Sequence, residues 1–169
     1  MRVAHFQVIP RGRRAKKLIP IIRRCSRAFK KQLAANDDVG MAKTSKTAWE
    51  AMTNLFENLR NEQDQGRLPS SFMRVNTAHI VDGATSAEQS DMIVARKIDR
   101  SHSGYGDLNL RDTLNKIAHH DTRIATFRVD GRGSHFLILG GRWKNSNWVA
   151  EILVSKLCKN ASAAAKAIV

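Results

Sequence analysis

The chain has 169 residues, of which 42% are hydrophobic, and its formal net charge at pH 7 is +14. This length and apolar fraction are typical of one globular domain that needs no metal or disulfide to hold its core together. The longest apolar stretches, at residues 18–22 and 136–139, are far shorter than the ~20 residues that cross a bilayer, which excludes a transmembrane helix.

The sequence predicts no bound metal and no cofactor. Its two cysteines, Cys25 and Cys158, belong to no CxxC pair and match no zinc-ligand spacing. The spacing of His119, His120, Asp121 and His135 also matches no common metal site. We therefore expect free thiols in a reducing compartment. Because the N-terminus lacks the continuous apolar segment of a signal peptide, we expect a cytoplasmic protein.

The positive charge is concentrated near the N-terminus. Residues 1–36 contain 11 of the 29 basic residues and no acid, whereas the rest of the chain has 18 basic and 15 acidic residues. This asymmetry points to a polyanionic partner, which is nucleic acid, an anionic membrane or an acidic protein. Of these three we expect nucleic acid or a protein, and a membrane is the least favoured. The residues of this region that we predict to bind nucleic acid are Arg11, Arg13, Arg14, Lys16, Lys17, Arg23, Arg24, Arg27, Lys30 and Lys31.

Residues 1–40 are expected to form a basic arm followed by an amphipathic helix. We expect residues 1–19 to be irregular and Pro20 to occupy the first position of a helix over 20–35. Apolar residues recur there at spacings of three and four, at Ile22, Cys25, Phe29 and Leu33. Met41 is an alternative start of the native chain, which would leave a nearly neutral domain.

A single core domain is expected over residues 41–160, followed by an Ala-rich tail at 161–169. It opens with a helix that Thr44, Ser45 or Thr47 caps. The apolar stripe of this helix comprises Trp49, Met52, Leu55, Phe56 and Leu59. Residues 66–83 contain Gly, Pro, Ser and Asn, which indicates a loop with a short strand near Val75.

Two more helices are predicted in the middle of the chain. Ser86 and Gln89 form a capping box for a helix over 87–99, which buries Met92, Ile93 and Ile98. Small residues at 101–106 indicate a linker. The next helix, over 108–119, turns Leu110, Leu114 and Ile117 inward.

The hydrophobic period then changes from helical to alternating. Thr122–Asp130 and Ser134–Leu139 are predicted strands joined by the turn Asp130-Gly131-Arg132-Gly133, so they form a hairpin that Gly140-Gly141 closes. A final helix over 148–160 is expected to bury Val149, Ile152, Leu153 and Leu157. The fold class is therefore α+β, with about five helices, a short antiparallel sheet and a C-terminal helix packed on it.

The helix at 108–119 carries the densest polar cluster. Arg111, Asn115 and His119 share one i, i+4 ridge, where a guanidinium, an amide and an imidazole could bind a phosphate and transfer a proton. We take these three as the candidate catalytic residues. The alternative is structural, because a histidine at a helix C-terminus is favoured by the helix dipole.

The same segment resembles a family of uncharacterised bacterial proteins. Leu108-x-Leu110-Arg111-Asp112-x-x-Asn115-Lys116-Ile117-x-His119, followed by a hairpin and Trp148 at the start of a last helix, looks like that family's L-R-[DE]-x-x-N-K-I-x-H helix and its G-x-x-K/G-x-x-W turn. The resemblance covers roughly residues 90–160. It implies no particular activity.

The helix also resembles the Arg-polar-spacer-His motif of HEPN-domain ribonucleases. In that resemblance Arg111 matches the arginine, Asp112 its polar neighbour and His119 the histidine. It implies an all-helical bundle and an endoribonuclease activity carried by Arg111 and His119.

A second polar candidate is the turn at residues 140–147. Arg142 and Lys144 flank Trp143, which would let the indole stack on a base while the cations hold a phosphate. The alternative is a connection in which Trp143 or Trp148 covers the edge of the core.

Three classes of function are consistent with these patterns. The first is a nucleic-acid-binding protein without catalysis, driven by the basic arm. The second is a HEPN-like RNA-cleaving enzyme that uses Arg111 and His119. The third is a protein-interaction or membrane-surface module, in which the helix over 20–35 meets its partner.

Overall fold

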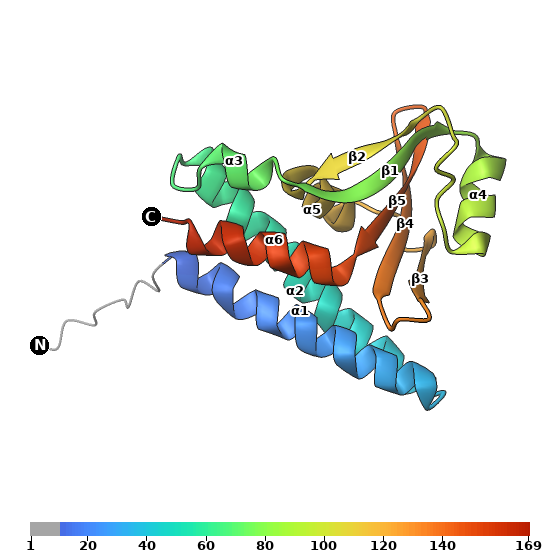
Figure 1. The fold of residues 1–169 in the computed structure, drawn as a ribbon, viewed down its shortest axis with the longest axis horizontal. Helices are drawn as coiled ribbons and strands as arrows, with labels where there is room; N and C mark the ends of the chain where they lie inside the picture. Colours follow the sequence, from blue (N-terminus) through green and yellow to red (C-terminus); the bar gives the residue numbers. More distant parts are fainter. Residues whose placement is uncertain (1–10) are drawn as a thin grey trace, which may run out of the picture.

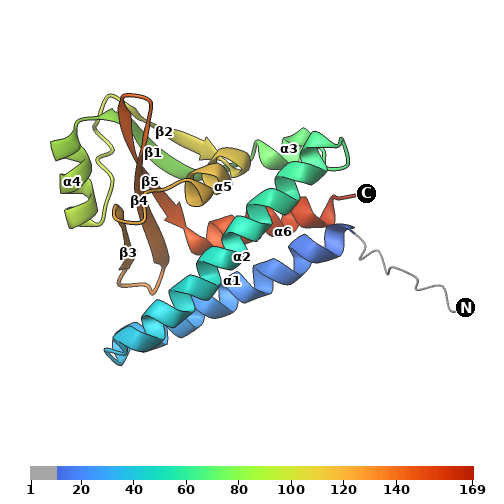
Figure 2. The same ribbon diagram turned by 180° about the vertical axis from the view of Figure 1, so that it is seen from behind.

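The computed structural model of the chain describes residues 11–169, and these residues form an α+β fold (Figure 1). Five antiparallel strands build one sheet in the order β2-β1-β5-β4-β3. The long helices α1, α2 and α6 lie on one side of the sheet and the short helix α4 on the other (Figures 1 and 2). None of the described helices has the length and apolar character needed to cross a membrane.

Helices α1 (Arg11–Ala34) and α2 (Asp38–Asp64) form a hairpin. One stripe of α1 is buried, and it consists of Ala15, Ile19, Ile22, Cys25 and Phe29. The link between the helices is tight, because Asn36 adopts a left-handed conformation with φ 53° and the Asp37 carboxylate accepts a hydrogen bond from the Gly40 N–H at 2.8 Å. The basic amphipathic helix expected over 20–35 is therefore present, and its described part extends back to Arg11.

The prediction that residues 1–19 are irregular is wrong for residues 11–19, the part of this segment that the structure describes. Residues 11–19 are helical, and Pro20 lies inside α1 rather than at its first position. Pro20 has no N–H to donate to the carbonyl of Lys16, four residues earlier, and both residues lie on the exposed side of the helix. Ala15 and Ile19 belong to the main hydrophobic core, together with residues of α2 and α6. Helix α1 is thus part of the domain rather than an arm outside it, and residues 1–10 lie outside the described part.

The apolar stripe predicted for the second helix is confirmed. Met52, Leu55, Phe56 and Leu59 are buried in α2, and Trp49 is half-buried. The predicted caps are wrong, because Asp37 caps α2 and residues 44–47 lie inside it.

The loop expected at 66–83 contains a short helix, α3 (Ser70–Met73), and a long strand, β1 (Asn76–Ala84). This strand pairs with β2 on one side and β5 on the other, so it is an interior strand. Helix α4 (Ser86–Ala95) follows, with its capping box at Thr85 and Glu88, one residue before the expected pair. Arg96 ends α4 in a left-handed conformation, so Ile98 is buried beyond the helix rather than on it.

The expected linker at 101–106 runs into an edge strand, β2 (Tyr105–Asn109). Helix α5 (Leu110–Ala118) matches the predicted helix closely. Asn109 caps it by accepting a hydrogen bond from the Asp112 N–H at 2.8 Å, and its apolar residues Leu110, Leu114 and Ile117 are buried as predicted.

The predicted hairpin is confirmed as β3 (Ala125–Val129) and β4 (His135–Trp143), although β4 runs on through Gly140 and Gly141. The prediction of a helix over 148–160 is wrong for its first half, because residues 146–153 form the strand β5 (Ser146–Leu153). This strand is interior and its burial is continuous from Trp148 to Ile152, so its sequence lacks the alternation of a half-exposed strand.

Helix α6 (Val154–Lys166) packs against α1 and includes most of the expected Ala-rich tail. Ala161, Ala164 and Ala165 are fully buried. Their small side chains let α6 approach its neighbours closely, which places this segment in the core rather than in a frayed end.

Candidate functional site

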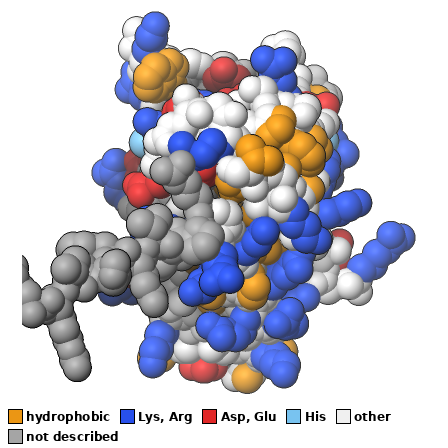
Figure 3. Space-filling model, turned by 90° about the vertical axis from the view of Figure 1, so that its left-hand side faces the viewer, with side chains coloured by type: hydrophobic (Ala, Val, Ile, Leu, Met, Phe, Trp, Pro, Cys, Tyr) orange, Lys and Arg blue, Asp and Glu red, His pale blue; other side chains and the backbone are white. Residues whose placement is uncertain are grey.

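The solvent-facing side of α1 is a continuous cationic surface. Exposed basic side chains occupy eight positions of the helix: Arg13, Arg14, Lys16, Lys17, Arg23, Arg24, Arg27 and Lys31. With 3.6 residues per turn, most of them fall opposite the buried stripe. Figure 3 shows Lys and Arg side chains gathered over the lower part of the face where α1 begins and α6 ends. We call these eight side chains the α1 cationic face.

Among the described residues, no acidic side chain forms an ion pair with the α1 cationic face. Helix α1 contains no acidic residue, and none of the ion pairs formed within residues 11–169 involves it. Lys30 is the exception to the exposed pattern, since its ammonium donates a hydrogen bond to the Gly133 carbonyl at 2.9 Å. Lys30 therefore serves to fasten α1 to the β3–β4 turn. Arg11 is also predicted to bind nucleic acid, but the structure describes only its backbone.

The second predicted contact, the turn around Trp143, lies apart from α1. The Trp143 side chain is 70% exposed at the tip of the β4–β5 hairpin, and Lys144 adopts φ 53° there. Lys30 of α1 contacts the turn at the opposite end of β4. A nine-residue strand is about 30 Å long, so Arg142, Trp143 and Lys144 do not extend the α1 cationic face.

The three predicted catalytic residues lie at the surface of α5. The Arg111 guanidinium donates hydrogen bonds to Gln63 Oε1 at 2.5 Å and to Asp64 Oδ1 at 2.9 Å, both at the end of α2. The hydrogen bond from Arg111 lowers the pKa of the Asp64 carboxyl. Arg111 is therefore engaged in joining α5 to α2.

His119 forms the C-terminal cap of α5 and is exposed, with its ring edge-on to Phe56 at 6.1 Å between centroids. Asn115 is also exposed, and its backbone carbonyl accepts the hydrogen bond of the His119 N–H. The described side-chain contacts of Arg111 and His119 are thus made to α2.

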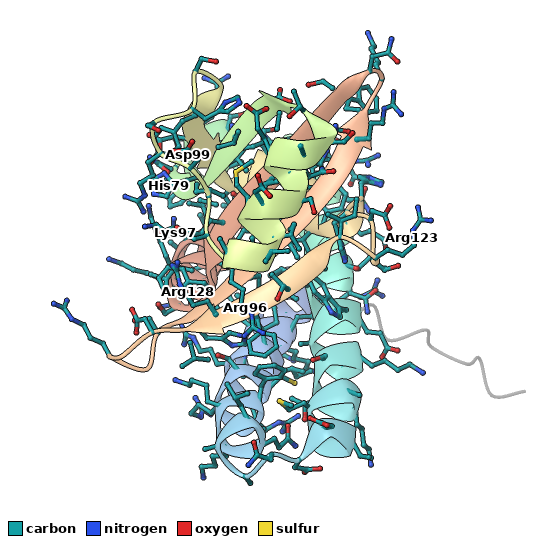
Figure 4. The ribbon with its side chains drawn as sticks, turned by 90° about the vertical axis from the view of Figure 1, so that its right-hand side faces the viewer. His79, Arg96, Lys97, Asp99, Arg123 and Arg128 are labelled. Carbon is teal, nitrogen blue, oxygen red and sulfur yellow. The ribbon has the colours of Figure 1, made fainter. Side chains whose placement is uncertain are left out.

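Sequence reasoning missed a polar cluster on the face of the sheet that α4 partly covers. His79 of β1 lies opposite Asp107 of β2, and its Nδ1 is 2.8 Å from the Asp107 carboxylate and 3.0 Å from the Tyr105 hydroxyl. On its other side His79 is paired in register with Glu151 of β5. In Figure 4 the labelled residues His79, Lys97, Arg128 and Arg96 follow one another down one side of α4, away from Arg123.

Glu151 is the most deeply buried charge of that cluster. Its side chain is 3% exposed, and it forms ion pairs with Arg128 at 3.2 Å and Arg100 at 3.5 Å. The contact with Arg128 is an ion pair rather than an aligned hydrogen bond, because Glu151 Oε2 has no well-oriented donor among the described residues. The Arg128 guanidinium also lies over the Phe136 ring at 4.3 Å. An acid within the apolar run Trp148–Leu153 is the signal that sequence reasoning passed over.

His119, His120, Asp121 and His135 form no metal-binding group in the described structure. Within residues 11–169, no three His, Cys, Asp or Glu side chains gather in a geometry that would hold a metal ion.

Comparisons with known proteins do not assign the chain. No protein-family model, no curated protein and no solved structure matches it. Its function has to be argued from its own residues.

Proposed function

We propose that the protein binds nucleic acid through the α1 cationic face and catalyses no reaction on it. The observation that carries this proposal is that eight exposed cations lie along one rigid helix without an acidic partner among the described residues. Phosphate groups of a nucleic-acid backbone would supply the missing negative charge, and the release of their counterions would drive binding.

The dimensions of the surface favour an extended polyanion. Helix α1 has 24 residues, so it is about 36 Å long at 1.5 Å per residue. Duplex DNA presents one negative charge per ~1.7 Å of its axis, so a helix of this length can face several phosphates at once. Its inner face is packed in the core, which fixes the backbone positions from which the cationic side chains project.

The absence of apolar anchors on this surface favours nucleic acid over a membrane. The large hydrophobic side chains exposed within the described part of the chain are Val39, Val75, Val94, Trp143 and Val169, and none of them belongs to α1. A helix that binds a membrane surface inserts an apolar face into the lipid. The apolar face of α1 is already occupied by α2 and α6.

The experiment is a salt series with two variants that lose the same charge. In the first variant Arg13, Lys17, Arg24 and Arg27 of α1 are changed to Ala. In the matched control four exposed cations elsewhere, Lys43, Lys46, Arg74 and Lys97, are changed to Ala. Affinity for a labelled duplex and a labelled single-stranded RNA is measured by fluorescence anisotropy from 50 to 300 mM salt.

We expect the wild type and the control to bind with a steep salt dependence. For the α1 variant, the slope of log K against log salt should become shallower by up to about 3–4, because each lost phosphate contact removes ~0.9. Equal affinities for the two variants would disprove the role of α1. A third variant with Arg142, Trp143 and Lys144 changed to Ala tests whether the hairpin tip makes a separate contact.

A further inference from the structure

A cleft opens between the helical hairpin and the sheet. Its walls come from α1, α2, β3 and β4, and its volume is about 270 Å³. Small-molecule sites in proteins are clefts of ~300–1,000 Å³, so this cleft is close to the lower end of that range. The cleft lies on the inner side of α1 and is separate from the α1 cationic face.

The floor of the cleft is apolar. Ile22, Met52, Leu137 and Val154 line it and are each at most 9% exposed. Phe29 and Phe127 stand at one end, with their rings edge-to-face at 4.7 Å between centroids, and Trp49 lines the α2 wall. Such a lining suits a flat ring system, because aromatic faces and edges stack favourably on one another.

The mouth of the cleft carries hydroxyl groups and no charge. Thr44 and Ser45 of α2 and Thr126 of β3 are half-exposed, and their hydroxyls make no hydrogen bond to the other residues that the structure describes. None of the lining residues, all within 11–169, is Lys, Arg, Asp or Glu. A charged group would enter without a partner ion, which is costly in an apolar site, so the lining favours an uncharged ligand.

A buried histidine forms the wall next to α1. His135 is 9% exposed, its ring stacks on Phe29 at 5.0 Å, and its Nδ1 lies 3.0 Å from the Ser26 hydroxyl. Its Nε2 is buried without a partner among the described residues. Burial lowers the pKa of His135 to about 4, and the nearby Lys30 acts in the same direction, so the imidazole is neutral at neutral pH. The wall therefore keeps the cleft free of charge while leaving one polar atom unsatisfied.

We propose that this cleft is a binding site for a small, uncharged aromatic compound of two fused rings that carries one hydroxyl or N–H group. Cavities of ~150 Å³ lined by apolar side chains hold benzene, so a cleft of about 270 Å³ has room for a bicyclic ring. The rings lie on the apolar floor, and the polar group reaches the hydroxyls at the mouth.

The test uses the full chain and three probes of the same ring size. The probes are 2-naphthol, naphthalene and 2-naphthoate, and binding is followed by the fluorescence of Trp49 and by the shift in Tm. Trp49→Phe identifies which part of the fluorescence change arises in the cleft. We expect 2-naphthol to bind saturably and to raise Tm. Naphthalene should bind more weakly, and the anionic 2-naphthoate should bind at least about tenfold more weakly than 2-naphthol.

Two substitutions that fill the cleft complete the test. Ala48→Phe on α2 and Ser45→Phe at the mouth should each weaken 2-naphthol binding about tenfold or more, because the new ring occupies the same space. Ala42→Phe is the matched control, since Ala42 is exposed on α2 and does not line the cleft. Unchanged binding in both filled variants would place the ligand elsewhere. Failure of all three probes to saturate the wild type, or preference for 2-naphthoate, would overturn the proposal.

Discussion

The buried carboxylate of Glu151 allows a quantitative test of how the sheet is held together. Its neighbours in the strand, Ala150 and Ile152, are fully buried on the opposite face, and its own side chain contacts Arg128 and Arg100. Breaking a buried ion pair by removing one partner costs about 3–5 kcal/mol, because the remaining charge loses its counterpart. The side chains of Arg128 and Arg100 are 28% and 60% exposed, so both can regain some water. We therefore expect Glu151→Ala to cost about 2–3 kcal/mol.

In a chain of this length, that loss should lower Tm by about 4–12 °C. The assay is urea unfolding followed by circular dichroism, with Glu57→Ala on an exposed position of α2 as the control. In the background Arg128→Met, which keeps an apolar side chain over Phe136, Glu151→Ala should cost at least about 1 kcal/mol less than in the wild type. A cost of Glu151→Ala as small as that of Glu57→Ala would refute the reasoning, because it would mean that the cluster contributes nothing to stability.

Three further predictions address the core, the buried histidine and the helix end. Phe56→Ala should destabilise the protein by about 3–5 kcal/mol in urea unfolding, because Phe56 is 5% exposed and a cavity would remain; a loss under about 1 kcal/mol would contradict its packing. The pKa of His135 is lowered to about 4 in the folded state, so the unfolded chain binds more protons as the pH falls below ~6.5. The free energy of unfolding of the wild type should then fall by on the order of 2 kcal/mol between pH 7 and pH 5, and His135→Asn should lack this decrease. Parallel plots of unfolding free energy against pH for the two proteins would disprove the prediction. Because His119 is a helix-end residue, His119→Ala should lower the free energy of unfolding by roughly 0.3–2 kcal/mol and leave the result of an RNA-cleavage assay unchanged. If instead the wild type cleaves an RNA and the variant loses that activity at unchanged Tm, the ribonuclease alternative is established.

The helical part of the fold could be predicted from sequence because its signal is local. The stripe from Met52 to Leu59 and the stripe of α5 each repeat at the helical period, and both are buried as predicted. Of the two aromatic residues in the stripe predicted for the second helix, Phe56 is buried, whereas Trp49 is only half-buried. The starts of the helices were predicted less well, since α2 is capped at Asp37, well before its apolar stripe begins.

Most of the sheet could not be predicted, for a physical reason. Strands β1 and β5 are interior, and both of their faces are covered in part, so their sequences do not alternate simply between apolar and polar. The run Trp148–Leu153 has the length and composition of a helix segment as much as of a strand. Because His79 and Glu151 lie on these two strands, the polar cluster that they share became visible only when the pairing of β1 with β5 was known.

The distribution of charge on α1 is itself an argument for a function outside folding. Like charges recur at i, i+4 spacing in the pairs Arg13 with Lys17, Arg23 with Arg27 and Arg27 with Lys31, and each such pair destabilises a helix by a few tenths of a kcal/mol. The cations of the first turn also oppose the helix dipole. Since these residues work against the helix that carries them, the Ala variant of Arg13, Lys17, Arg24 and Arg27 should have a higher Tm than the wild type at low salt while binding nucleic acid more weakly. A lower Tm would mean that these side chains stabilise the fold, and the functional explanation of the α1 cationic face would lose its support.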